Sequence, residues 1–174
     1  MRAARGQRGQ GLVEFAVIFP IFAFFLFAVI DGGLLMGRYN NINNAAAEGA
    51  RLAAVDGSSN VVADVVARVK DQTHGLLGGA GTSTSCADWD SKPTVNVICV
   101  QWVSGPEGEA PGDVGSAVRV RLRYRDEVLT PVFTLFGNAN PGWDITACAT
   151  QRLEQSVRPV PQGHDLPGVT TCTG

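Results

Sequence analysis

The sequence predicts an α+β protein: one long N-terminal helix crosses a membrane and extends into a small domain with a second helix and an antiparallel sheet of about three strands. Three observations support this prediction. A long apolar segment lies near the N-terminus, apolar residues then recur at helical spacing, and much of the second half alternates between apolar and polar residues. A chain of 174 residues is also long enough to bury a core.

The apolar segment is long enough to span a bilayer. No charged residue lies between Phe15 and Ile30, and this run contains most of the eight phenylalanines. A helix that starts at Leu12 and ends at Ile30 rises roughly 28 Å, which is close to the roughly 30 Å thickness of the hydrocarbon layer. The segment is therefore predicted to be a transmembrane helix.

The charges on either side of the segment predict its orientation. Three arginines precede the first acidic residue of the chain, whereas Asp31 directly follows the apolar run. By the positive-inside rule, the protein is a single-pass protein of the cell membrane with a cytoplasmic N-terminus and an extracytoplasmic C-terminal domain. A cleaved secretory signal is disfavoured because no small-x-small site separates the run from further apolar residues.

Glu14 lies inside the apolar region and needs an explanation. A carboxylate at this depth costs a few kcal/mol, so an intramembrane acid is a functional-site hypothesis by default. The alternative is that Glu14 lies shallow enough to reach the interface and has no further role. The residues around Glu14 favour the functional interpretation.

The stretch Gly9 to Phe15 reads GQGLVEF. It resembles the processing site of type IV prepilin-like proteins, which a membrane aspartyl peptidase cuts after glycine and in which the fifth mature residue is glutamate. The resemblance implies that Gly9 ends the leader, Gln10 begins the mature chain and Glu14 is its fifth residue. Two other glycines, Gly6 and Gly11, are nearby, but only Gly9 puts the glutamate in the fifth position.

A longer set of motifs resembles one branch of these proteins. GLVEFAVIFPIF, the later Glu48–Arg51 block EGAR and, more weakly, ITACATQRLE near the end are similar to the TadE-like pseudopilins of tight-adherence (Flp-type) pilus systems. The resemblance implies a pilin-like outer domain, processing by a prepilin peptidase, and packing against other pilins or pseudopilins through the N-terminal helix. Glu14 and Phe15 are the expected assembly residues, and membrane lipid surrounds the helix.

The expected organisation follows the composition along the chain. One helix is predicted from about Gln10 to Val55, with bends at Pro20 and at the pair Gly32–Gly33. Five segments are expected: residues 1–9 are a cleaved, basic cytoplasmic leader; 10–33 are the transmembrane part of the helix; 34–56 are its extracytoplasmic part; 57–154 are a globular α+β domain; and 155–174 are a proline-rich tail tied by a disulfide.

The globular segment contains one helical pattern and several alternating ones. VVADVVARVKD carries valines at helical spacing and predicts a helix, with N-caps available in the preceding DGSS. Period-two alternation predicts strands over residues 94–103, 117–125 and 143–153, which pair as an antiparallel sheet. Its apolar face would carry Val118, Val120, Leu122 and Tyr124.

The four cysteines predict disulfides, because their number is even and the domain is expected outside the cytoplasm. Three pairings are available, and we favour Cys86 with Cys99 and Cys148 with Cys172. The cysteines show no CxxC spacing, and no metal site or cofactor is expected.

Four arginines alternate along one predicted strand face: Arg119, Arg121, Arg123 and Arg125. The favoured interpretation is a solvated face balanced by nearby acids, namely Asp113, Asp126, Glu127 and Asp144. The alternative is a patch that binds a polyanion or an acidic partner.

The resemblance predicts a minor pilin or pseudopilin that takes part in pilus assembly or initiation and is not an enzyme. Neither His74 nor His164 accompanies a recognised nucleophile motif, and a net charge of −2 argues against nucleic acid as a partner. Two other classes remain: an uncleaved, membrane-anchored binding module, and a secreted hydrolase that would need a catalytic cluster. The first residue of the mature protein distinguishes the three.

Overall fold

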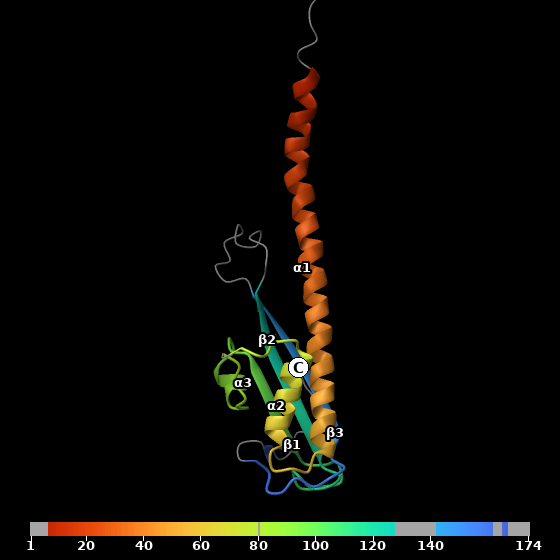
Figure 1. Ribbon diagram of the computed structural model, residues 1–174, viewed down its shortest axis with the longest axis vertical. Coiled ribbons are helices and arrows are strands. Elements are labelled where there is room, and N and C mark those ends of the chain that lie inside the picture. The colour runs from red at the N-terminus through yellow and green to blue at the C-terminus, as the bar shows by residue number, and fades with distance from the viewer. Residues whose placement is uncertain (1–6, 80, 128–141, 162–164, 167–174) are drawn as a thin grey trace, which may run out of the picture. The chain divides into compact units, whose positions relative to one another are not determined.

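A computed structural model describes residues 7–79, 81–127, 142–161 and 165–166, and it confirms the predicted α+β class (Figure 1). Within these residues the helices are α1 (Gln7–Val55), α2 (Val61–Gln72) and α3 (Asp88–Ser91). The strands are β1 (Val97–Val103), β2 (Ala117–Glu127), β3 (Gly142–Arg152) and β4 (Asp165–Leu166).

The chain forms two compact units, and α1 belongs to both. The first unit comprises Met1–Met36 and Glu127–Pro141, and the second comprises Gly37–Asp126 and Gly142–Gly174. The described part of the first unit consists almost entirely of the apolar half of α1. The helix is continuous through Pro20 and through the glycine pair at 32–33, where bends were expected.

The sheet of the second unit has the strand order β3-β2-β1-β4. Strands β1 and β2 are antiparallel, with Val100 opposite Val120. β3 lies next to β2. Just before β2, the N–H of Gly115 donates to the carbonyl of Leu153 at 3.0 Å, and the N–H of Leu153, just after β3, donates to the carbonyl of Ser116 at 2.8 Å. The start of β2 thus lies beside the end of β3, so the two strands are antiparallel. The short β4 was not predicted, and it pairs in parallel with β1 through Trp102 and Asp165.

One face of the sheet is covered by α1 and α2. Three of the four predicted face residues, Val118, Val120 and Leu122, are fully buried, whereas Tyr124 is only half-buried. Helix α2 contributes every fourth residue to this core, and the C-terminal part of α1 contributes mainly alanines. The N-cap of α2 is Asn60 rather than a residue of the preceding DGSS, and its side chain makes no capping bond.

The opposite face of the sheet lies under the segment that precedes β1. This segment contains α3, which the sequence did not predict, and in Figure 1 α3 lies beside β1, on the side away from α1. Ser83 joins it to the sheet through a bridge to Val97 and backbone bonds of 2.8 and 2.9 Å to Asn96 and Ile98. This face is covered in part, since Asp144 and Thr146 of β3 remain exposed.

Candidate functional site

The expected processing site lies at the beginning of α1. Both Gly9 and Gln10 fall within its first turns. The side-chain amide of Gln10 donates to Glu14 at 3.2 Å, which is a contact between residues one helical turn apart. The Glu14 side chain is otherwise exposed, and the ring centroid of Phe15 lies 5.4 Å from that of Phe19.

The apolar half of α1 is uncovered. Its most apolar window has a mean hydropathy of 2.6 and none of that window is buried within the described residues. Large apolar side chains point outward from Leu12 through Met36. A helix that is apolar all round and has no protein cover requires an apolar surrounding, so this segment is a candidate membrane span.

The EGAR block, at the other end of α1, fastens the helix to α2. The carboxylate of Glu48 accepts hydrogen bonds from Arg51 at 3.2 Å and from Arg68 of α2 at 3.1 Å. One residue later, Gly49 is buried between the helices. A Cβ at this position would lie 2.9 Å from Cγ2 of Val69 and 3.4 Å from Cγ1 of Val65. The block therefore combines an ion pair with a close helix–helix approach that only glycine permits.

The alanines beside the EGAR block also let α1 pack closely. Ala46, Ala50 and Ala53 are at most 1% exposed, and Ile42 is fully buried one turn earlier. Small side chains let the axis of α1 approach the sheet closely, as shown by the 3.6 Å between a Cβ at Gly49 and Cγ1 of Val120. This face of α1 is thus part of the core of the second unit.

A protein-family comparison matches these two regions of α1. The model for the family described as TadE-like protein aligns with residues 9–51, a range that begins at Gly9 and ends with the EGAR block. Residues 9–51 form a TadE-like segment. This confirms the family resemblance for that part of the chain. No curated protein and no solved structure matches the chain.

The TadE-like segment contains a further contact that the sequence did not predict. Arg38, just outside the apolar half of α1, donates from Nη1 to the carboxylate of Asp126 near the end of β2. The side chain of Asp126 is only 7% exposed, so the pair links the helix to the sheet in a partly desolvated place. The two residues are far apart in the sequence, and no local pattern connects them. Asp126 was expected to balance the strand arginines instead.

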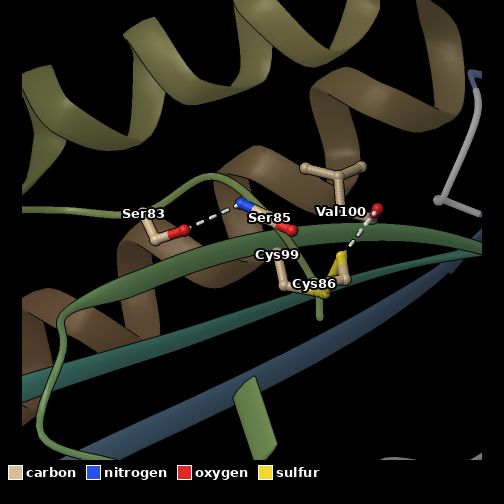
Figure 2. The surroundings of a disulfide bond; sticks show 5 residues. All are labelled: Ser83, Ser85, Cys86, Cys99 and Val100. Carbon is tan, nitrogen blue, oxygen red and sulfur yellow. Dashed lines mark hydrogen bonds between the residues drawn. A yellow bond between two sulfur atoms is a disulfide. The ribbon is translucent and has the colours of Figure 1, made fainter. Parts of the chain in front are cut away.

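The segment before β1 is held by the disulfide between Cys86 and Cys99, whose Cα atoms are 4.8 Å apart (Figure 2). This is one of the two disulfides favoured from the sequence. Cys148 is also disulfide-bonded, and its expected partner Cys172 lies outside the described residues. Cys86 and Cys99 are 13 residues apart in the sequence. A disulfide that closes a loop of that size stabilises the folded state by about 3 kcal/mol in the chain-entropy account.

Arg123 holds the same segment from the sheet side. Its guanidinium donates to four backbone carbonyls, two of them at 2.6 Å, those of Trp89 and Lys92. The other two, of Asp88 and Val95, lie at 3.2 Å. Arg123 is 7% exposed. The carbonyls of Asp88 and Lys92 also accept backbone N–H groups at 3.2 Å, so Arg123 adds a second bond to each and joins α3 to the residues before β1.

The favoured interpretation, a solvated face balanced by nearby acids, was therefore wrong for Arg119 and Arg123, whereas Asp144 does pair with Arg125. Arg119 and Arg123 are buried, and Arg125 is half-buried and bonded to Asp144 at 3.3 Å. Asp113 pairs with Arg158 instead. The segment that carries α3 cannot be inferred from strand periodicity, and it covers Arg123 on this face.

The remaining predictions concern the two histidines and metal binding. His74 is exposed just after α2, and His164 lies outside the described residues. In the part of the chain that the structure describes, no cluster of His, Cys, Asp or Glu could hold a metal ion.

Acid is expected to weaken the α1–α2 junction. Hydrogen bonds from Arg51 and then Arg68 hold the pKa of Glu48 below its usual 4.5. A lowered folded-state pKa stabilises the fold above pH 4.5, and this contribution disappears as the pH falls through the folded-state value. At pH values below 4.5, the full-length protein in detergent should therefore unfold at a lower temperature than at neutral pH.

The matched variants are Glu48→Gln and Asp64→Asn. Glu48→Gln should lower the midpoint at pH 7 and reduce its further loss in acid, because no carboxylate remains to be protonated. Asp64→Asn, which alters an exposed acid of α2, should leave the acid-induced loss as in the wild type. An unchanged acid-induced loss in Glu48→Gln would contradict the assignment.

Proposed function

We propose that this protein is a minor pilin or pseudopilin of a tight-adherence pilus, inserted in the membrane by α1, processed by a prepilin peptidase after Gly9, and used in pilus assembly or initiation. One observation carries the proposal. A TadE-like segment combines an uncovered apolar half, a single carboxylate near its start and a second half packed into a folded domain. The proposal includes an extracytoplasmic outer domain and assigns no catalytic activity.

Processing would create the partner that Glu14 needs. Cleavage after Gly9 leaves an α-amino group on Gln10, which is cationic below a pKa of about 8. The side chain of Gln10 already reaches Glu14 at 3.2 Å, so a charge at the start of the mature helix lies within one turn of the carboxylate. Such an amine, on the same or a neighbouring subunit, would neutralise the acid where water does not compete.

The peptidase would have to open the beginning of α1, because the Gly9–Gln10 bond is helical. The cost is modest at this position, since the first N–H groups of a helix have no acceptor within the helix. Glycine lacks a Cβ and lets the opened chain approach the catalytic groups closely.

Gly9→Leu is expected to block processing and leave membrane insertion intact. The intact mass and N-terminal sequence of the protein should be measured in cells with and without the peptidase. Wild-type protein should begin at Gln10, and the variant at Met1.

Gly6→Leu is the control, because it makes the same change within the leader and should still be processed. Normal maturation of Gly9→Leu would show that the cleavage site is elsewhere. A wild-type protein that keeps Met1 would favour an uncleaved anchored module.

Glu14→Leu is expected to reduce assembly while improving membrane insertion. The change removes the costly charge but leaves the partner amine uncompensated. Crosslinking between cysteine-tagged α1 helices and the number of surface pili should both fall at matched protein level, with cleavage continuing.

The control Gln10→Glu keeps the helix length and tests whether a second carboxylate at the mature N-terminus also impairs assembly. Unchanged crosslinking and pilus number in Glu14→Leu would remove Glu14 from the mechanism.

A further inference from the structure

A cleft of about 520 Å³ opens on the second unit, where α1, the α3 segment, β2 and β3 come together. Its lining includes Tyr39, Asn43, Trp89, Arg121, Asp144 and Thr146. The volume is within the usual range of small-molecule sites, which combine apolar walls with a few polar groups.

Arg121 is the member of the arginine row whose bonding is incomplete. The guanidinium of Arg123 is occupied by four carbonyls and that of Arg125 by Asp144. No hydrogen bond or ion pair joins the Arg121 guanidinium to an oxygen acceptor within the described ranges, although the residue is half-buried. Burial lowers its pKa, with the charge of Asp90 acting in the opposite sense. A partly desolvated guanidinium favours an anion that can replace its lost water.

Trp89 orients this guanidinium. The Cζ atom of Arg121 lies 3.9 Å from the centroid of the Trp89 ring, in cation–π geometry. Stacking occupies one face of the planar group and leaves its N–H groups in the plane, which is the arrangement that binds a carboxylate through two parallel bonds. The disulfide and Arg123 hold the segment that carries Trp89. The guanidinium of Arg121 therefore lies against a ring whose segment is itself held in place.

The rest of the cleft fits hydroxyl groups rather than more charge. The amide of Asn43 donates to the carbonyl of Tyr39 at 2.9 Å, and Asp144 accepts from Arg125 through Oδ1. Remaining oxygens of these side chains, together with the exposed hydroxyl of Thr146, can accept from or donate to a ligand. Tyr39 is 48% exposed and offers an aromatic face.

We propose that this cleft binds a uronic-acid unit of a polysaccharide, with its carboxylate on Arg121, its ring against Tyr39 and its hydroxyls bonded to Asn43 and Asp144. This site is independent of the pilus assignment, since it uses none of the residues that process or insert the chain. A lone carboxylate satisfies Arg121 but not the aromatic and hydroxyl-binding walls, which is why a sugar acid fits better than an acidic side chain.

Three small probes separate these contributions in a saturation-transfer NMR titration of the full-length protein in detergent. Methyl β-D-glucuronide carries the carboxylate and the ring, methyl β-D-glucoside carries the ring alone, and N-acetylglutamate amide carries the carboxylate alone. The glucuronide should bind at least about tenfold more tightly than either of the others.

Variants locate the binding. Arg121→Gln should weaken glucuronide binding by about tenfold or more. Arg51→Gln makes the same change at an arginine that is 73% exposed and outside the cleft, and should leave binding unchanged. Because Arg121→Gln also removes the contact with Trp89, Thr146→Trp provides a second test by filling the cleft from an exposed strand position, with the fold checked by circular dichroism.

Each other outcome overturns the proposal. Absence of glucuronide binding, or binding that survives both Arg121→Gln and Thr146→Trp, would show that the cleft is not the site. Equal binding of the glucoside would show that the carboxylate is not recognised. Equal binding of the glutamate derivative would assign the cleft to acidic peptide instead.

Discussion

Replacing Gly49 with leucine is expected to lower the free energy of unfolding of the second compact unit by about 3 kcal/mol or more. A Cβ alone would lie 2.9 Å from the Val69 methyl, and both Val69 and Val65 are fully buried. Their β-branched side chains have few alternative rotamers, so the helices must move apart. Urea unfolding of the full-length protein in detergent, followed by intrinsic tryptophan fluorescence, to which the buried Trp102 contributes, measures the loss.

Gly37→Leu is the matched control, because it makes the same substitution in the same helix. A Cβ at Gly37 meets nothing within 4 Å among the described atoms. Removing an exposed helical glycine should stabilise α1 by about 0.5–1 kcal/mol. Equal destabilisation by both substitutions would show that helix propensity or the detergent, rather than contact with α2, decides the result.

Arg123→Met should cost about 3–5 kcal/mol, a loss comparable with breaking a buried ion pair from one side. Methionine keeps much of the aliphatic volume but removes the donors to four carbonyls at the end of α3 and before β1. Those carbonyls would remain under the covering segment with fewer partners, which is the expensive outcome for a buried polar group. The same urea titration measures the change.

Arg125→Met tests whether burial causes this loss. Arg125 lies on the same strand and bonds Asp144, but the two side chains are 30% and 43% exposed. Exposed ion pairs contribute about 0–1 kcal/mol, so the control should be nearly neutral. A similar cost for both variants would mean that the four carbonyl bonds contribute little. Protection of the α3 amides in hydrogen exchange should fall only in Arg123→Met.

These stability variants also separate folding from processing. Gly49→Leu acts on the outer part of α1 and should leave the cut after Gly9 in place, whereas Gly9→Leu should block the cut and leave the second unit folded. A loss of pili in both variants would therefore have two distinguishable origins. The TadE-like segment joins them because one helix carries both the proposed processing site and the packing surface.

The sequence by itself determined the elements that depend on local periodicity and hydropathy. The apolar run predicted the candidate membrane span, and helical spacing predicted α2. Period-two alternation predicted β1, β2 and β3 to within a few residues. The motifs from Gly9 to Arg51 predicted a TadE-like resemblance, which the family model confirms for residues 9–51. These properties are readable because neighbours along the chain create them.

Only the tertiary structure decided which polar side chains are buried and which groups they bond. Alternating arginines on a strand indicate a solvated face, yet the disulfide-tied segment carrying α3 covers this one, and Arg123 becomes a structural donor while Arg121 lines a cleft. Likewise, the EGAR block is recognisable as a motif, but its contacts with Arg68 and Val69 come from another helix. The physical reason is that solvent exposure, and with it the energy of a charge, is set by segments that are distant in sequence and adjacent only after folding.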